Sequence, residues 1–279
     1  MRTSRYIEAV DKESVKPVLY EEERKQEIVD YVLKHGRASV AQLAELFQVS
    51  ESTVRRDLKD LEDAKRLRRT HGGAVPMQDD NAEPPFLEKE DRFRSQKAAI
   101  AKQAAELIEE GDRIVLDSGT TTHHLAKELK RFRQLTVVTN SLVVAQELGG
   151  HPTIELILVG GTLRPETLAM VGPLAERAFE RIHAHKAFVA TNGIHPEAGL
   201  TTPNLLEAAV KERMIRSASR VVLLADHSKY GRVSFAKVAD LSSVDQCIID
   251  EGATAECLHQ LEKAGIETIV AREGGSKHD

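Results

Sequence analysis

The segment 117–122, Asp-Ser-Gly-Thr-Thr-Thr, combines residue types that bind an anion. It follows an apolar run at 114–116 and precedes a helix predicted from residue 123. Gly119 lets the backbone approach a ligand, while hydroxyls and the amides of a helix start can hold phosphate oxygens. No Gly-Lys-Ser/Thr follows, and no GxGxxG is present, so neither a nucleotide-hydrolysing loop nor a dinucleotide site is expected. The alternative is ordinary helix capping by Ser118 and Thr120.

Four more polar loops follow apolar runs, at 139–141, 160–162, 191–193 and 226–229. The apolar runs lie at 114–116, 135–139, 154–159, 187–190, 221–225, 247–249 and 268–270. Helical segments fit between them at 123–129, 142–148, 174–182, 203–217 and 254–264. This alternation predicts a doubly wound, mostly parallel α/β domain. Ligands of such sheets bind beyond the carboxyl ends of the strands, so the five loops predict one binding site at one sheet edge.

The charged residues of this region leave two functions open. They could supply the acid, base and electrophile of an isomerase, or hydrogen bonds to the hydroxyls of a bound sugar; the residues are Asp117, Glu207, Lys211, Asp226 and Lys229. His123-His124 and His183-x-His185 lack the i, i+4 spacing and third ligand of a zinc site. We therefore predict no metal and no cofactor.

A second constellation occupies residues 49–75. Ser50 is a good helix N-cap, and Val54, Leu58 and Leu61 give the following helix one apolar face. Short hydroxyls and basic side chains fall mainly on the other face, namely Ser52, Thr53, Arg55, Arg56 and Lys59. Such a helix can enter the major groove of DNA. Taken alone, the same residues equally describe a solvated face with local ion pairs.

The segments around this helix favour the interpretation that it binds DNA. Residues 21–35 and 40–47 predict two preceding helices, the second opened by a capping box at Ser39. A basic hairpin follows, with a turn at Gly72-Gly73 that tolerates positive φ; its basic residues are Lys65, Arg66, Arg68, Arg69 and His71. Three helices followed by a basic hairpin predict a winged helix-turn-helix domain.

Composition sets the outer limits. The chain has 279 residues and a net charge of −5, so positive charge is local, in the hairpin. No apolar run approaches the length of a membrane span, and the first residues lack the apolar segment of a secretory signal. Cys247 and Cys257 are expected to be buried, reduced thiols. These features predict a cytoplasmic protein without membrane partners.

The N-terminal motifs resemble those of the DeoR family of bacterial transcriptional regulators. The matching residues are the run from Arg24 through Ile28, the segment Ser50-x-x-Thr53-Val54-Arg55-Arg56-Asp57-Leu58, and LRRTHGGAV. The resemblance implies DNA contacts from Ser39, Ser50, Ser52, Thr53, Arg55, Arg56, Lys59, Arg66, Arg68, Arg69 and His71. Lys65 is a departure, since relatives often carry glycine there.

Residues 95–272 also resemble the effector domain of this family, in LDSGTTT, LTVVTNS, LVGGTLR, KAFVATNGI, GLTTP, EAAVKERMI and LLADHSKYG. That domain is similar to ribose-5-phosphate isomerase and CoA-transferase folds. The resemblance implies a phosphate held by Asp117, Ser118, Gly119, Thr120, Thr121, Thr139 and Asn140. It implies a sugar surrounded by Gly160, Gly161, Asn192, Gly193, Glu207, Lys211, Asp226 and Lys229. His185 and His195 stand where relatives commonly carry acids, which could change the polarity of the pocket.

The expected organisation is therefore a flexible extension (1–20), a winged helix-turn-helix domain (21–76), a linker (77–94), an effector-binding domain (95–272) and a flexible tail (273–279). The resemblance implies a homo-oligomeric repressor of a carbohydrate operon, released from operator DNA by a phosphorylated sugar. An activator or dual regulator, and an isomerase-like enzyme, are the alternatives.

Overall fold

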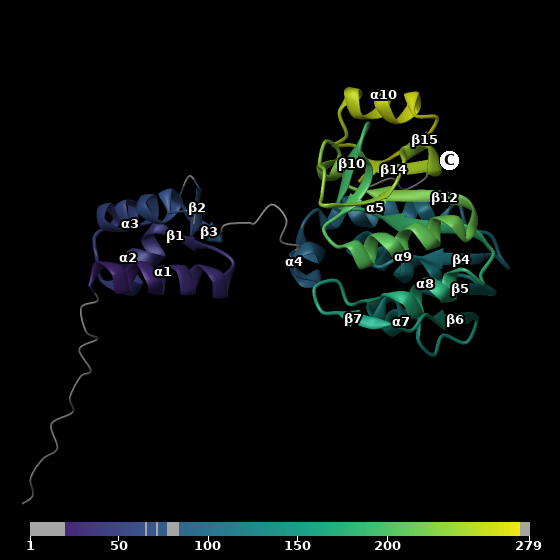
Figure 1. The fold of residues 1–279 in the computed structure, drawn as a ribbon, viewed down its shortest axis with the longest axis horizontal. Helices are drawn as coiled ribbons and strands as arrows, with labels where there is room; N and C mark the ends of the chain where they lie inside the picture. The colour runs from purple at the N-terminus through teal and green to yellow at the C-terminus, as the bar shows by residue number, and fades with distance from the viewer. Residues whose placement is uncertain (1–19, 65, 71, 77–83, 274–279) are drawn as a thin grey trace, which may run out of the picture. The chain divides into compact units, whose positions relative to one another are not determined.

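The computed structural model describes residues 20–64, 66–70, 72–76 and 84–273. The chain forms two compact units, Met1–Asp80 and Asn81–Asp279 (Figure 1). Nearly all of the predicted extension and tail, much of the predicted linker, and both Lys65 and His71 lie outside the described residues.

The first unit is a three-helix arrangement with a small antiparallel sheet. Its elements are α1 (Glu21–His35), β1 (Ala38–Ser39), α2 (Val40–Phe47), α3 (Glu51–Asp63), β2 (Leu67–Thr70) and β3 (Gly73–Pro76). Gln48, in the left-handed region at φ 52°, makes the tight turn between α2 and α3. The strand order is β1-β3-β2, and Ile28, Leu43 and Leu58 are fully or almost fully buried between the elements. The predicted winged helix-turn-helix fold is confirmed.

The turn expected at Gly72-Gly73 lies between β2 and β3, and Gly72 belongs to it. Gly73 does not have the left-handed φ that was expected there. Gly73 instead lies in β3 against β1, where a Cβ atom would stand 2.0 Å from the carbonyl oxygen of Ala38. Glycine is required there because two backbones approach each other, which the local sequence pattern does not reveal.

The second unit is built on a seven-stranded parallel sheet in the order β15-β14-β12-β9-β4-β5-β6. All seven predicted apolar runs contribute to it: β4 (Arg113–Leu116), β5 (Leu135–Thr139), β6 (Ile154–Leu158), β9 (Ala184–Ala190), β12 (Ala218–Ala225), β14 (Gln246–Asp250) and β15 (Glu267–Ala271). From β4 the chain adds strands first on one side and then, from β9, on the other. The point where this direction reverses lies between β4 and β9, and such points are where α/β sheets bind ligands.

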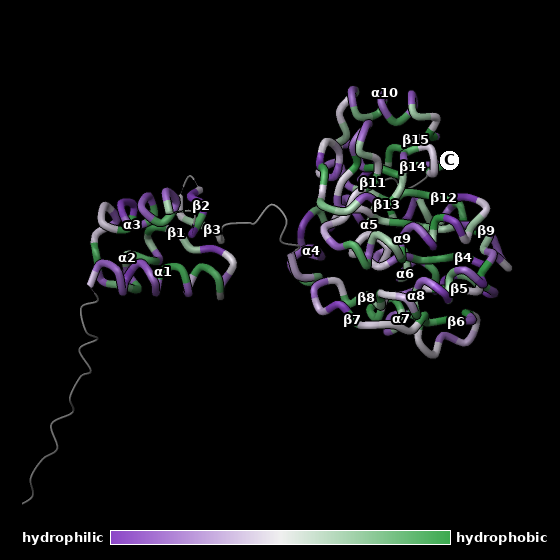
Figure 2. The backbone as a smooth tube through the Cα atoms, viewed as in Figure 1, coloured by the Kyte–Doolittle hydropathy of each residue, from purple (hydrophilic) through white to green (hydrophobic). Residues whose placement is uncertain are grey.

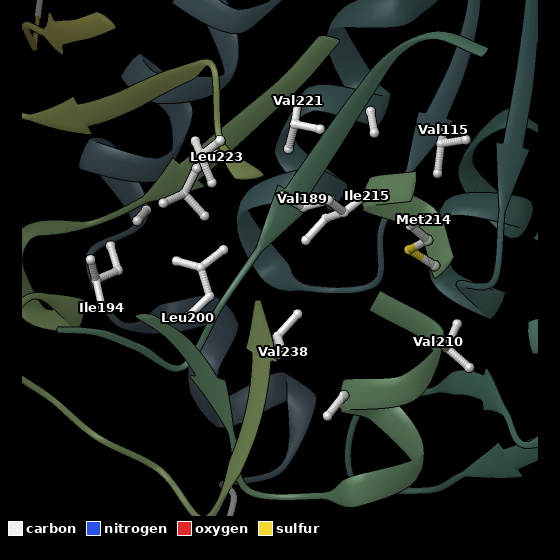
Figure 3. Close-up of a cluster of buried hydrophobic side chains, with 14 of the residues drawn as sticks. Val115, Val189, Ile194, Leu200, Val210, Met214, Ile215, Val221, Leu223 and Val238 are labelled. Carbon is white, nitrogen blue, oxygen red and sulfur yellow. The ribbon is translucent and has the colours of Figure 1, made fainter. Parts of the chain in front are cut away.

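Helices cover both faces of the sheet because successive strand residues point to opposite sides. One face packs against α5 (Arg94–Ala105), α6 (Thr120–Leu129) and α7 (Leu142–Leu148), with Ile114 and Leu116 of β4 in that core. The other packs against α8 (Pro173–Phe179), α9 (Leu205–Arg216) and α10 (Ala255–Lys263), with Val115 of β4. Figure 3 shows Val115, Val189 and Met214 in this second core. Figure 2 shows hydrophobic colour along the central strands and alternating colours along the helices.

Several short elements were not predicted. These are α4 (Phe86–Asp91), the antiparallel pair β7 (Thr162–Arg164) and β8 (Ala169–Val171), and the antiparallel sheet of β10 (Gly193–His195), β11 (Gly199–Thr202) and β13 (Ala236–Ala239). They are too short for a periodic pattern to show. The expected burial of Cys247 and Cys257 is confirmed, and burial raises the pKa of the Cys257 thiol to about 11.

Candidate functional site

Helix α3 presents a polar, basic face to solvent. Ser52, Arg55, Arg56 and Lys59 are exposed, while Val54, Asp57, Leu58 and Leu61 are buried. Ser50 caps the helix, its Oγ accepting a hydrogen bond from the Thr53 amide at 3.1 Å. Arg55 Nη2 forms an exposed ion pair with Glu51, at 2.6 Å from Glu51 Oε2.

The hairpin formed by β2 and β3 carries the other basic residues. Arg66, Arg68 and Arg69 are exposed. Arg69 is held to α3 because its amide donates to Glu62 Oε1 at 3.0 Å. Ser39 is half-buried at the start of α2, where its hydroxyl accepts from the Gln42 amide at 3.1 Å. The predicted DNA-binding residues of the described chain thus lie on α2, α3 and the hairpin.

Asp57 has a structural role that was not predicted. Its carboxylate is fully buried and pairs with Arg24 of α1, with Nε–Oδ2 at 2.6 Å and Nη2–Oδ1 at 3.1 Å. This bidentate pair fixes α3 to α1. Arg24 and Asp57 both belong to the quoted motif, but 33 residues separate them, so no local pattern indicates their contact.

A cavity of the second unit opens at the carboxyl ends of β4, β9 and β12, where the strand order reverses. Nine predicted effector-binding residues line it: Ser118, Gly119, Thr120, Thr121, Asn192, Glu207, Lys211, Asp226 and Lys229. Seven further residues line it, of which only Thr191 belongs to a loop predicted at the site: Phe86, Lys89, Thr167, Ala190, Thr191, Leu224 and Ala225. Ala190, Leu224 and Ala225 lie at the ends of predicted strands. That position was the only sequence signal that they line the cavity.

The start of α6 is open toward this cavity. Its N-cap is Gly119, at φ 152°, and no side chain caps the helix. The first bond of the helix runs from the His123 amide to the Gly119 carbonyl at 3.0 Å. The amides of residues 120–122 precede it and can bind an anion. Ordinary helix capping by Ser118 and Thr120, the alternative to an anion site, is therefore not found. The helix was predicted from residue 123, but it begins at Thr120. The prediction missed its first turn because three β-branched threonines give little helical signal.

Asp117 is buried beside the start of α6. Its carboxylate accepts hydrogen bonds from the Ser118 amide at 2.7 Å and the Ala190 amide at 2.9 Å, and it forms an ion pair with Lys211. Lys211 also donates to the Ala190 carbonyl at 3.1 Å. Asp117 thereby positions the loops that follow β4 and β9, and it orients a lysine that lines the cavity.

The remaining acids of the cavity are also engaged. Glu207 accepts from the hydroxyls of Thr167 and Thr202 and lies 3.2 Å from Arg164 Nη1. Asp226 accepts from the Ser228 amide at 3.1 Å, and its carboxylate lies 3.9 Å from Lys229 Nζ. Burial lowers the pKa of Lys229, and the neighbouring Asp226 carboxylate opposes that shift.

Six predicted effector residues do not line the cavity: Asp117, Thr139, Asn140, Gly160, Gly161 and Gly193. The loop after β5 is tied to β8, since Asn140 Nδ2 donates to the Met170 carbonyl at 3.0 Å. Gly161 faces β8, where a Cβ atom would meet the Val171 carbonyl oxygen at 2.7 Å. Three of the five polar loops contribute to the cavity, because β5 and β6 lie farther from the reversal point.

The two histidine departures lie away from the cavity lining. His185 is near the amino end of β9, where Nδ1 lies 2.9 Å from Asp112 Oδ1. His195 Nδ1 accepts from the Glu197 amide at 3.2 Å in the turn between β10 and β11. Within the described residues, no helix is long and apolar enough to cross a membrane.

Comparisons with known proteins match both units. A family model described as the DeoR C terminal sensor domain matches residues 92–251, and one described as a DeoR-like helix-turn-helix domain matches residues 24–79. The HTH-type transcriptional regulator GlpR of Haloferax volcanii is 41% identical over 90% of this chain and 98% of its own. The HTH-type transcriptional repressor GlcR of Bacillus subtilis is 34% identical over 93% of this chain and 100% of its own. Ribose 5-phosphate isomerase A from Methanocaldococcus jannaschii matches with 18% identity and a TM-score of 0.36, over 48% of this chain and 53% of that chain.

Proposed function

This chain belongs to the DeoR family of transcriptional regulators, and we propose that it represses a carbohydrate operon until a phosphorylated sugar releases it from operator DNA. The observation that carries the effector part is the cavity at the strand-order reversal. It combines an uncapped helix start for a phosphate with lysines and hydrogen-bonding side chains for a sugar. The relative named as a repressor supports the direction of control.

The proposed partners are operator DNA, the sugar phosphate and further copies of the chain. Each winged helix-turn-helix unit reads a short site, so at least a dimer is needed to bind repeated half-sites with useful affinity. Such a regulator works in the cytoplasm. The exposed basic residues of α3 and the hairpin supply the contacts to bases and phosphates.

We propose ligand sensing rather than turnover for the cavity. An isomerase needs a carboxylate that is free to accept a proton from its substrate. Asp117 is instead buried, does not line the cavity and is bound by two backbone amides and Lys211. Glu207 is held by two threonine hydroxyls and Arg164, and Asp226 accepts hydrogen bonds from the Ser228 amide and hydroxyl. A turnover assay with pentose and hexose phosphates is expected to give no product above the rate without protein.

A charge placed at the start of α6 tests the proposed anion site. Thr120→Asp suits a helix N-terminus, yet its carboxylate occupies the position proposed for the phosphate. We expect this variant to bind operator DNA as the wild type does and to resist release by every sugar phosphate. Ser141→Asp is the matched control: it adds the same charge at the start of α7, on the same sheet edge but outside the cavity lining. Release of the Thr120→Asp variant at wild-type concentrations of sugar phosphate would refute the site.

A further inference from the structure

Helix α4 is both a wall of the cavity and the first helix after the DNA-binding unit in the chain. Phe86 and Lys89 of α4 line the cavity, and Phe86 is buried. The first unit ends at Asp80, and α4 begins at Phe86. A ligand in the cavity therefore lies against the element through which the chain enters the second unit.

Glu90 holds α4 on α6. Its Oε1 lies 3.4 Å from His123 Nδ1, 3.3 Å from His124 Nε2 and 3.5 Å from Lys127 Nζ, all on α6. Burial alone would raise the pKa of the Glu90 carboxyl, but the two histidines outweigh burial and hold that pKa well below its usual range. The Phe86 ring also packs on His123, with centroids 5.8 Å apart. The start of the same helix, α6, forms the anion site.

The chain just beyond the C-terminal end of α4 rests on a second element of the cavity. Phe93, between α4 and α5, adopts φ 54° in the left-handed region, and its ring meets the edge of His227 at 4.9 Å. His227 belongs to the loop that carries Asp226 and Lys229 into the cavity. Helix α4 is thus anchored at both ends to elements that line the cavity.

The contact between α4 and α6 leaves polar atoms unpaired. Within the described chain, Glu90 Oε2, His123 Nδ1 and His124 Nε2 are buried and have no hydrogen-bond partner. The groups attract each other at ion-pair distance, but their geometry is not that of hydrogen bonds. Buried polar groups that are imperfectly paired would gain free energy from a small shift of α4 that completes their hydrogen bonds.

We propose that α4 transmits occupancy of the cavity by an anionic ligand to the DNA-binding unit, with Lys89 contacting the ligand and Glu90 setting the position of α4 on α6. This inference rests on the proposed function, because it requires an anion at the start of α6. It goes further in assigning two ligand contacts, Phe86 and Lys89, and a positioning residue that touches no ligand.

A tryptophan on α4 tests whether the helix responds to ligand. The chain contains no tryptophan, and Leu87 is 77% exposed on α4, so Leu87→Trp gives a single fluorescent reporter. Inorganic phosphate, titrated at constant ionic strength, is the probe, and calorimetry on the same protein measures its binding independently. We expect a saturable fluorescence change whose midpoint matches the calorimetric affinity. Binding without a fluorescence change would overturn the inference alone, while no binding would refute the anion site of the proposed function as well.

Glu90→Gln tests the positioning residue. In the Leu87→Trp background it is expected to keep the phosphate affinity but lose most of the fluorescence change. In the otherwise unchanged full-length chain it should lower the factor by which a releasing sugar phosphate weakens operator binding, from the range of about 5–150-fold typical of allosteric coupling to near one. Glu88→Gln is the matched control on the same helix, since Glu88 pairs only with Arg92 at the surface among the contacts described for it. An equal loss of the fluorescence change in Glu90→Gln and Glu88→Gln would contradict the assignment of Glu90 as the positioning residue. So would a Glu90→Gln variant in which sugar phosphate weakens operator binding as much as in the wild type.

Discussion

The buried ion pair between Arg24 and Asp57 allows a sharp prediction about the DNA-binding unit. Asp57→Asn keeps the shape of the side chain but removes the charge that compensates the Arg24 guanidinium. Removing one partner of a buried pair costs about 3–5 kcal/mol, because the other charge stays buried without compensation. A domain of about 60 residues has a free energy of unfolding of about 3–9 kcal/mol. The substitution should therefore remove about a third or more of the stability of this unit.

Calorimetric unfolding of the full chain measures this effect for each unit. A loss of 1 kcal/mol shifts the midpoint of a small domain by about 4–8 °C, so the transition of the first unit should fall by at least about 12 °C. The transition of the second unit should not move, and phosphate binding should persist. Operator binding should weaken to the extent that the first unit is unfolded at the assay temperature.

Two controls separate the buried pair from charge in general. Asp60→Asn breaks an ion pair of 2.9 Å to Lys25, but Asp60 is partly exposed, so this substitution should shift the first transition far less than Asp57→Asn does. The double variant Arg24→Met, Asp57→Leu removes both charges and should recover much of the stability. If Asp57→Asn left the first transition within a few degrees of the wild type while abolishing operator binding, Asp57 would be a DNA contact and this reasoning would be refuted.

Three other substitutions test separate features. Arg68→Ala should reduce the slope of log operator affinity against log salt by about one, as expected for one lost phosphate contact; an unchanged slope would place Arg68 away from DNA. Gly73→Ala should lower the midpoint of the first unit sharply, because its Cβ atom would stand 2.0 Å from the Ala38 carbonyl oxygen; a folded, DNA-binding variant would contradict that contact. Burial lowers the pKa of Lys97 to about 8, so the unfolded chain holds more protons above that pH. The free energy of unfolding of the second unit should rise between about pH 8 and 10.4 in the wild type and lose that rise in Lys97→Met, as followed by denaturant unfolding at each pH.

The sheet and the recognition helix could be predicted because their signals are local. Each parallel strand is a short apolar run bounded by polar residues, and Val54, Leu58 and Leu61 mark one face of α3. Parallel strands share one edge, so the convergence of the loops after β4, β9 and β12 followed from strand identity alone. The resemblance to known regulators supplied the named residues within those loops.

Other features depend on contacts between distant residues. The pairs Arg24–Asp57 and Asp117–Lys211 join segments 33 and 94 residues apart, and no spacing rule connects them. Strand order decided that the loops after β5 and β6 lie outside the cavity lining, and order cannot be read from alternation. Helix α4 is too short for periodicity, so its place in the cavity wall emerged only from the fold.

Linkage between effector and operator is the central claim, and fluorescence anisotropy with DNA from upstream of the coding region tests it directly. Operator affinity is measured across a panel of sugar phosphates, and the affinity of the active sugar phosphate is then measured with and without saturating operator. One sugar phosphate should weaken operator binding, and operator should weaken the binding of that sugar phosphate by the same factor. Equal sugar phosphate affinity in the presence and absence of operator would contradict the account.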